Sequence, residues 1–266
     1  MLINTTQLKN FVIRAIDGDL GKVDEFYFDD ETWAIRYMTV DTGGWLGARK
    51  VLISPISLIR TDWQARQVDV SLTKLQVENS PDINTHQPVS RQFEAAYLEY
   101  YGYGNYWGGP NLWGAGLCPS DLAVSRAAPT GKIPGALRRE SSDSHLRSTA
   151  ALTGYHIQSA DGEIGPVEDL VMDDEAWAIR YVKVATRNWW PGKKVLFSPK
   201  WIQQASWADA TLYLAFNRAA VKTSPDYLAS TPITRDYESR LHRHYGQTPY
   251  WLNKAEAEHN PRDLRT

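Results

Sequence analysis

Two acidic clusters are the residues most able to do chemistry. Residues 29–31 read Asp-Asp-Glu, and residues 173–175 repeat them 144 positions later. Carboxylate oxygens are ligands for hard cations, but the spacing and central glycine of an EF-hand loop are absent. Asp is common in turns, where its side chain accepts hydrogen bonds from nearby backbone N–H groups. We therefore interpret each cluster as a turn capped by its first Asp, and we predict no metal site.

An arginine follows each acidic cluster among apolar residues. Arg36 and Arg180 occupy the same place in two Trp-Ala-Ile-Arg-Tyr segments. A guanidinium group could hold an anion or the carboxylate of a partner protein. Charged side chains are rarely buried unless they are paired, so we favour an ion pair within the chain. The candidate partners are Glu25 or Asp29 for the first arginine and Asp169 or Asp173 for the second.

Other reactive residue types do not form recognisable sites. His242 and His244 are the only histidines close together, and positions i and i+2 do not share a helix face, so a zinc site is not expected. Cys118 has no histidine at motif spacing, so we expect a thiol without a catalytic role. The dinucleotide, Walker and nucleophile-elbow motifs are absent. We predict no catalytic residue, no cofactor and no enzymatic activity.

Aromatic residues are the remaining candidates for binding. A run of rings extends from Tyr97 to Trp113, and Tyr106-Trp107 is repeated as Tyr250-Trp251. Such rings could stack on single-stranded nucleic acid, but that mode also needs a basic groove, and Glu94 and Glu99 lie beside the run. We favour packing of a helix on a barrel, or a protein interface. The candidate interaction residues are Arg36, Arg180, Trp33, Trp177, Tyr106, Trp107, Tyr250 and Trp251.

Short strands must position these residues. Strands are predicted at residues 11–16, 21–28, 33–40 and 50–53, and Asp17-Gly18 between the first two predicts a tight turn. A final hairpin is expected over 58–63 and 67–72 because residues 68, 70 and 72 alternate with polar ones. A helical turn at 73–77 and a helix that begins at Ser90 and ends near Gly102 complete the unit. Residues 1–10 are taken as a polar lead-in.

The same series of predicted strands, turns and helices then occurs a second time. Residues 8–107 align with 152–251 without a gap, and about a third of the positions are identical. Such regularity indicates an internal duplication. We therefore predict a mainly β protein with appended helices, in which two small β-barrels arise by duplication. The paired-barrel hypothesis places them face to face about a pseudo-twofold axis, as intramolecular barrel pairing.

Four segments follow from this reading. Residues 1–107 form the first barrel with its helix, and residues 151–251 form the second. Residues 108–150 are rich in Gly, Pro, Ser and Ala without periodicity, which predicts a flexible linker. Residues 252–266 are a charged tail that we expect to fray.

Charge and composition limit the partners. The net charge is −2, and residues 1–107 carry 10 basic and 14 acidic side chains. Nucleic-acid binders need a basic excess to neutralise phosphates, so binding of nucleic acid is not expected. No apolar stretch approaches the ~20 residues that span a bilayer, and the first residues do not resemble a signal peptide. With one cysteine, the chain suits a reducing compartment, and we expect a cytoplasmic protein without membrane insertion.

The repeated pattern resembles the PRC-barrel family. The resemblance is carried by Asp17, Gly18, Gly21, Val23, Asp29, Asp30, Trp33, Arg36, Tyr37, Val40, Val51, Leu52 and Pro55, with counterparts 144 residues later. The family is named from the cytoplasmic domain of the H subunit of the purple-bacterial photosynthetic reaction centre. A related barrel is the second domain of a 16S rRNA processing factor.

The resemblance implies a module for assembly or protein interaction, since the family shares no catalytic residues. It links the chain to reaction-centre or electron-transfer complexes, with a protein partner. A ribosome- or rRNA-associated maturation factor is a second hypothesis, although no basic RNA-facing domain precedes the barrel. A third is a small-ligand binder that uses a cleft between the barrels, where Arg36 and Arg180 would converge with carboxylates.

Overall fold

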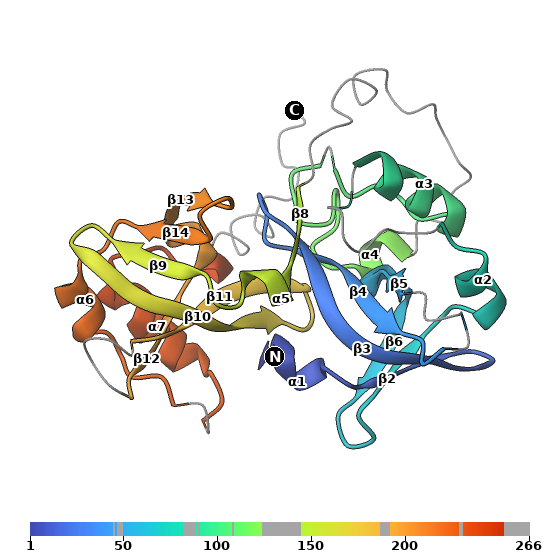
Figure 1. Ribbon diagram of the computed structural model, residues 1–266, viewed down its shortest axis with the longest axis horizontal. Helices are drawn as coiled ribbons and strands as arrows, with labels where there is room; N and C mark the ends of the chain where they lie inside the picture. Colours follow the sequence, from blue (N-terminus) through green and yellow to red (C-terminus); the bar gives the residue numbers. More distant parts are fainter. Residues whose placement is uncertain are drawn as a thin grey trace, which may run out of the picture. The chain divides into compact units, whose positions relative to one another are not determined.

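The computed structural model describes residues 1–44, 46, 50–81, 89, 91–107, 109–123, 145–186, 192–228 and 231–252. These residues form a mainly β structure with two seven-stranded sheets, each built mostly from one repeat (Figure 1). The predicted fold class is confirmed as a duplicated pair of mainly β domains with appended helices, but over the described residues neither sheet closes into the predicted barrel. Parts of the predicted linker (124–144) and almost all of the charged tail (253–266) lie outside the described residues.

The first sheet has the strand order β5-β4-β3-β2-β7-β6, and β8 pairs with β3 beside this path. Its strands are β2 (Val12–Ala15), β3 (Gly18–Asp29), β4 (Ile35–Asp41), β5 (Lys50–Ile53), β6 (Leu58–Asp62), β7 (Gln67–Val70) and β8 (Leu146–Ser148). All neighbours are antiparallel except β2 and β7, which are parallel. Among the described residues no pairing joins β5 to β6, so the sheet stays open at that edge, where the 3₁₀ turn η1 (Pro55–Ser57) connects the two strands.

The second sheet repeats this order as β12-β11-β10-β9-β14-β13, with β1 pairing β10. Its strands are β1 (Leu2–Asn4), β9 (His156–Ser159), β10 (Gly162–Asp173), β11 (Ala178–Ala185), β12 (Lys194–Phe197), β13 (Ile202–Ser206) and β14 (Thr211–Leu214), with η2 (Pro199–Trp201) before β13. The matching topology is what the gap-free duplication predicts.

Short helices flank the sheets. They are α1 (Thr5–Leu8), α2 (Lys74–Glu78), α3 (Arg91–Tyr101) and α4 (Ser120–Ala123) before β8, and α5 (Thr149–Leu152), α6 (Arg218–Lys222) and α7 (Arg235–His244) after it. Thr73 caps α2 by accepting a hydrogen bond from the N–H of Gln76, and the side chain of Gln76 accepts one from the N–H of Thr73. The expected helical segments are confirmed as α2 and α3, while Ser90, the predicted first residue of the second helix, lies outside the described residues.

The glycines after each Asp-Gly turn are needed where strands approach closely. Gly21 has φ +146°, and a Cβ there would lie 2.1 Å from the carbonyl oxygen of Asp41. Gly165 has φ +149°, with 1.9 Å to the carbonyl oxygen of Ala185. Only glycine fits such a position. The β2–β3 pairing shifts register beside Gly21, and the β9–β10 pairing shifts register beside Gly165. The second glycine of the motif thus maintains the bend of β3 and of β10.

The chain separates into two compact units that do not follow the repeat boundary. The first comprises Met1–Gly154 with Asp169–Val182, and the second comprises Tyr155–Glu168 with Lys183–Thr266. Strands β10 and β11 therefore begin in one unit and end in the other. A segment of the second repeat is part of the core of the first unit.

Three sequence expectations need correction. Residues 1–10 are no mere lead-in, since they form β1 and α1. The predicted linker over 108–150 has ordered parts, because 109–123 contains α4 and two β-bridges, and 145–150 contains β8 and the start of α5. Trp33 lies outside the strand predicted at 33–40, since β4 begins at Ile35.

Candidate functional site

The first unit contains a set of reciprocal contacts that we call the repeat seam. It comprises β1 against the end of β10, β8 against the end of β3, and the turns 29–35 and 173–179. Leu2 pairs with Asp173, and Leu146, which stands 144 residues after Leu2, pairs with Asp29. The strand β8 lies along β3 in Figure 1. Each repeat therefore contributes a short N-terminal strand to the long strand of the other.

The two turns of the repeat seam also make reciprocal contacts. The N–H of Ile35 donates to the carbonyl oxygen of Trp177 at 2.7 Å, and the N–H of Ile179 donates to that of Trp33 at 2.8 Å. Between them, Ala34 bridges to Ala178, which is its own counterpart in the repeat. Contacts in which i meets j and j meets i are the signature of an isologous interface.

Two tryptophans have strained backbones at this seam. Trp33 has φ +59° and Trp177 has φ +50°. A bulky residue rarely adopts positive φ and does so only where its surroundings impose it. Both carbonyls are used in the reciprocal hydrogen bonds, and both rings are buried, against Phe28 for Trp33 and Phe26 for Trp177. The candidate interaction residues Trp33 and Trp177 thus act inside the first unit.

The acidic clusters are capped turns, as the sequence predicts. The Oδ1 atom of Asp29 accepts hydrogen bonds from the N–H groups of Glu31 and Thr32 at 3.1 and 3.0 Å. The Oδ1 atom of Asp173 accepts the equivalent hydrogen bonds from the N–H groups of Glu175 and Ala176, at 3.1 and 3.4 Å. Within the described residues, no group of three His, Cys, Asp or Glu side chains has a metal-binding arrangement.

Both arginines form the predicted ion pairs with the first Asp of their cluster. Arg36 Nη2 lies 3.6 Å from Asp29 Oδ2, and Arg180 Nη2 lies 3.1 Å from Asp173 Oδ2. Burial of the Asp173 carboxyl opposes its ionisation, but the charge and hydrogen bonds of Arg180 outweigh it and lower its pKa. The open alternative between Asp29 and Glu25, and between Asp173 and Asp169, is thereby resolved.

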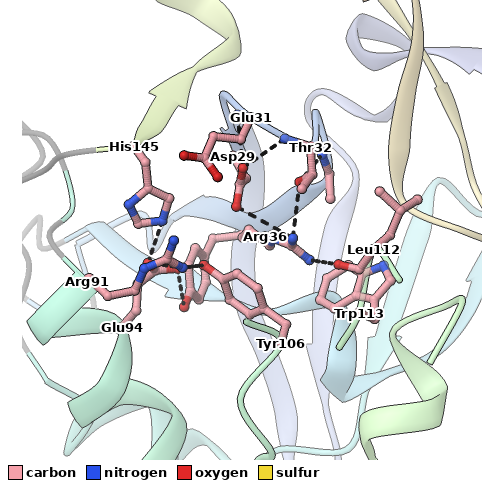
Figure 2. A network of polar contacts seen from close by, with 12 residues as sticks. Asp29, Glu31, Thr32, Arg36, Arg91, Glu94, Tyr106, Leu112, Trp113 and His145 are labelled. Carbon is pink, nitrogen blue, oxygen red and sulfur yellow. Dashed lines mark hydrogen bonds and ion pairs between the residues drawn. The ribbon is translucent and has the colours of Figure 1, made fainter. Parts of the chain in front are cut away.

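Arg36 lies in a closed aromatic site (Figure 2). Its guanidinium carbon is 3.7 Å from the ring centre of Tyr106 and 4.7 Å from that of Trp113. It donates to the carbonyl oxygen of Leu112 at 2.6 Å and to Thr32 Oγ1 at 3.2 Å. The side chain is only 2% exposed. A ligand could reach it only after displacing one of these rings.

Trp113 was not among the candidate residues predicted from the sequence. It lies within the predicted linker, yet it is fully buried, and its Nε1 donates to the carbonyl oxygen of Ala176 at 2.8 Å. A narrow turn presents it, in which Asn111 bridges to Gly114 and Trp113 to Gly116. The available signal in the sequence is the aromatic run that begins at Tyr97, for which we expect either packing of a helix on a barrel or a protein interface.

A second polar cluster surrounds Glu94, which is completely buried (Figure 2). Its carboxylate accepts hydrogen bonds from the hydroxyls of Tyr106 and Tyr37 and lies 3.5 Å from Arg91 Nη1 and 2.8 Å from His145 Nε2. Burial raises the pKa of Tyr37 and Tyr106 well above the usual value, and the charge of Glu94 raises it further. Both hydroxyls therefore remain protonated donors to Glu94.

Tyr106-Trp107 and Tyr250-Trp251 belong to one repeated device, the Arg-Glu-Tyr clasp. Arg91 Nη1 donates to the hydroxyl of Tyr106 at 3.2 Å, and Arg91 stacks on Trp107 at 4.8 Å. In the second unit the clasp consists of Arg235, Glu238, Tyr250 and Trp251, with the Arg–Tyr hydrogen bond also at 3.2 Å and the stacking distance at 4.1 Å. The clasp ties the residues after each helix back to the helix.

The eight candidate interaction residues therefore have internal contacts. The carbonyls of Trp33 and Trp177 accept hydrogen bonds across the repeat seam. Arg36 stacks on Tyr106, and Arg180 pairs with Asp173. Trp107, Tyr250 and Trp251 belong to the clasps.

Comparison with known proteins identifies a domain in the first repeat. Residues 4–82 match the family model described as "PRC-barrel domain". The chain thus contains a PRC-barrel domain in its first repeat. An uncharacterised protein of Deinococcus radiodurans is 35% identical over 94 residues. That match covers 34% of each chain, so the chain spans about a third of the length of this relative.

The match fits the structure, because residues 4–82 include the six strands β2 to β7 of the first sheet. No helix in the described part of the chain is long and apolar enough to cross a membrane.

Proposed function

We propose that this PRC-barrel protein is a non-catalytic module for assembly or protein interaction. The observation that carries the proposal is the repeat seam, in which one chain makes the reciprocal contacts that two identical subunits would make in a dimer. A duplicated chain of this kind holds two related domains together without depending on concentration. Such a scaffold suits a protein that presents surfaces to partners.

The arrangement of the polar residues supports a role without turnover. Among the described residues of the first unit, Arg36 and Glu94 are the most deeply buried charged side chains, and both are surrounded by groups of the chain itself. A catalytic group must reach its substrate, directly or through one water. The buried charges therefore serve the fold, and function falls to the outer surface.

Affinity purification of the tagged full-length chain from its source cells, after mild crosslinking, tests the proposal. The expected result is the recovery of a discrete protein partner in stoichiometric amount, from extracts with and without nuclease. A matched control is the chain with Gly21→Ala and Gly165→Ala, which cannot maintain either bend and should lose the partner with its fold. Recovery of ribosomal RNA with salt-sensitive binding, or of no partner at all, would count against the proposal.

A further inference from the structure

The two repeats differ sharply on the exposed surface around one short helix, which is α2 after β7 in the first repeat and α6 after β14 in the second. We call the first of these surfaces the α2 face and define it as the turn 16–19, helix α2 and residues 99–100. Three large apolar side chains are exposed on it: Ile16 (70%), Leu75 (65%) and Tyr100 (41%). Scattered exposed apolar residues are ordinary, but several of them on adjoining segments are typical of an interaction site.

Hydrogen bonds bring the three segments of the α2 face together. The N–H of Ile16 donates to the carbonyl oxygen of Leu72 at 2.9 Å, and the N–H of Lys74 donates to Asp17 Oδ1 at 2.8 Å. The hydroxyl of Tyr100 donates to the carbonyl oxygen of Gln76 at 2.8 Å. The turn and the end of α3 are therefore both fixed to α2, on either side of Leu75.

The matched surface of the second repeat, the α6 face, has the same framework. There the N–H of Arg218 donates to Asp161 Oδ1 at 2.7 Å, and His244 Nε2 lies 2.8 Å from the carbonyl oxygen of Ala220. Its exposed residues are different, because Ala160, Ala219 and His244 stand in place of Ile16, Leu75 and Tyr100. The fold is satisfied by small and polar residues at these positions, so the fold does not require the large apolar ones.

The charges of the two faces differ in the same way. The α2 face carries Asp17, Asp19, Glu78 and Glu99 with the single basic residue Lys74. The α6 face carries Asp161 and Glu163 with the three basic residues Arg218, Lys222 and Arg243. Two acidic positions of the α2 face, 78 and 99, have thus become Lys222 and Arg243 on the α6 face. An acidic rim around apolar side chains fits a partner of the opposite charge.

We propose that the α2 face docks a protein segment that carries apolar side chains flanked by Lys or Arg. This inference rests on the proposed function, since it names the surface and the chemistry of the partner of the same module. The apolar side chains would provide the buried contact, and the acidic rim would select basic flanks and speed association. The α6 face lacks both features and does not take this partner.

The test uses the full chain in its source cells with a photo-crosslinking amino acid placed at position 75 or, as the matched control, at position 219. Adducts are cleaved, and the crosslinked segment is identified by mass spectrometry. We expect position 75 to capture one protein through an apolar segment with flanking Lys or Arg, and position 219 not to capture it. An adduct with an acidic protein segment, with RNA or with lipid, or none at position 75, would overturn the proposal.

Two sets of variants replace residues of the α2 face with those that the second repeat already tolerates. Ile16→Ala, Leu75→Ala and Tyr100→His remove the apolar contact, and Glu78→Lys with Glu99→Arg reverses the rim. Each set should lower recovery of the partner about tenfold or more, as expected when central contacts or complementary charges are lost. The control Ile59→Gln changes another exposed apolar residue of the first repeat to its counterpart and should leave recovery unchanged.

The design separates two kinds of failure. If the wild-type chain recovers a partner and both variant sets retain it, the α2 face is wrong while the interaction function stands. If the wild-type chain recovers no partner, the proposed function fails together with the inference. Circular dichroism of each variant excludes loss of fold as the cause of lost binding.

Discussion

Arg36 and Arg180 begin from nearly the same sequence and end in different surroundings. Arg180 approaches its carboxylate closely, with Nη2 and Nε at 3.1 and 3.4 Å from Asp173 Oδ2, and its side chain is 14% exposed. Arg36 is 3.6 Å from Asp29, is 2% exposed, and makes its shortest polar contact with the carbonyl oxygen of Leu112. The Arg180 ion pair is thus the shorter of the two, while the Arg36 ion pair is part of a network that includes Leu112 and Thr32.

The difference has two local sources. The repeated nonapeptide differs only at Thr32 and Ala176, and Thr32 Oγ1 accepts a hydrogen bond from Arg36 that alanine cannot accept. The turn at 109–116 then places the ring of Trp113 against the guanidinium group of Arg36. The indole N–H of Trp113 donates to the carbonyl oxygen of Ala176. Around Arg36 the duplicated site thus includes one side chain that its counterpart lacks and the turn at 109–116, while the backbone contacts of the repeat seam are reciprocal.

The largest expected effect is the loss of Arg36. Arg36→Ala leaves the buried carboxylate of Asp29 without its cation, and breaking such a buried pair costs about 3–5 kcal/mol. Arg180→Ala should cost less, about 1.5–3 kcal/mol, as for a hydrogen bond to a charged group nearer the solvent. Urea unfolding of the two variants checks the order. Equal losses would show that the aromatic surroundings of Arg36 add nothing.

Trp113 comes next. Trp113→Phe keeps a ring but removes the N–H, which leaves the carbonyl oxygen of Ala176 unpaired and should cost about 1–3 kcal/mol. Trp107→Phe is the matched control, because Trp107 is only partly buried and stacks on Arg91. Thermal unfolding should show a melting temperature for Trp113→Phe well below that for Trp107→Phe. The reverse order would remove Trp113 as the source of the asymmetry.

Thr32 has a smaller effect that depends on Arg36. Thr32→Ala should cost about 1 kcal/mol through the lost hydrogen bond to the guanidinium. In an Arg36→Ala background the same change should cost almost nothing, because the donor is already gone. The double-mutant cycle is measured by urea unfolding. Additive losses would mean that Thr32 stabilises the turn independently of the arginine.

The smallest expected effect is a pH dependence in the Glu94 cluster. Burial opposes protonation of His145, but the hydrogen bond to Glu94 and its charge outweigh burial and raise the pKa of His145. Because the folded pKa lies above the unfolded value, the stabilisation is fully present below about pH 6.5 and is lost as pH rises through the folded pKa. NMR titration should therefore place the pKa of His145 above the usual value, and Glu94→Gln should lower it.

His242 in the second unit is the built-in control for this titration. Burial lowers the pKa of His242, so its contribution has the opposite sign and weakens as pH falls. His145→Asn should remove the stabilisation that is present at low pH and leave the His242 titration in place. An unchanged pH profile of the His145→Asn variant would show that the His145–Glu94 contact has no energetic role.

Much of the fold could be read from the sequence because it depends on local patterns. The alternation at 67–72, the Asp-Gly turns and the helical turn at 73–77 each involve only a few neighbouring residues, and the duplication supplied a second copy of each. The Asp29 turn and both Arg–Asp pairs were predictable for a related reason, since a charged residue among apolar neighbours needs a nearby partner.

The strands β1 and β8 escaped prediction because three residues carry no periodicity. Leu2 and Leu146, Thr5 and Thr149, and Leu8 and Leu152 match at the same offset, which was the available signal. Such short strands gain their stability from pairing with a distant strand, and pairing over more than 100 residues leaves no mark on local composition.

By itself, the sequence determined that this protein is two copies of one β-rich unit, with a capped acidic turn and a paired arginine in each. Only the tertiary structure decided that the short strands are exchanged between the repeats, and that Trp33 and Trp177 turn their carbonyls toward one another's strands. It also decided that Trp113 encloses one arginine of the pair. The physical reason is the same in each case: these contacts join residues far apart in the chain, whose favourable energy exists only once both partners are in place.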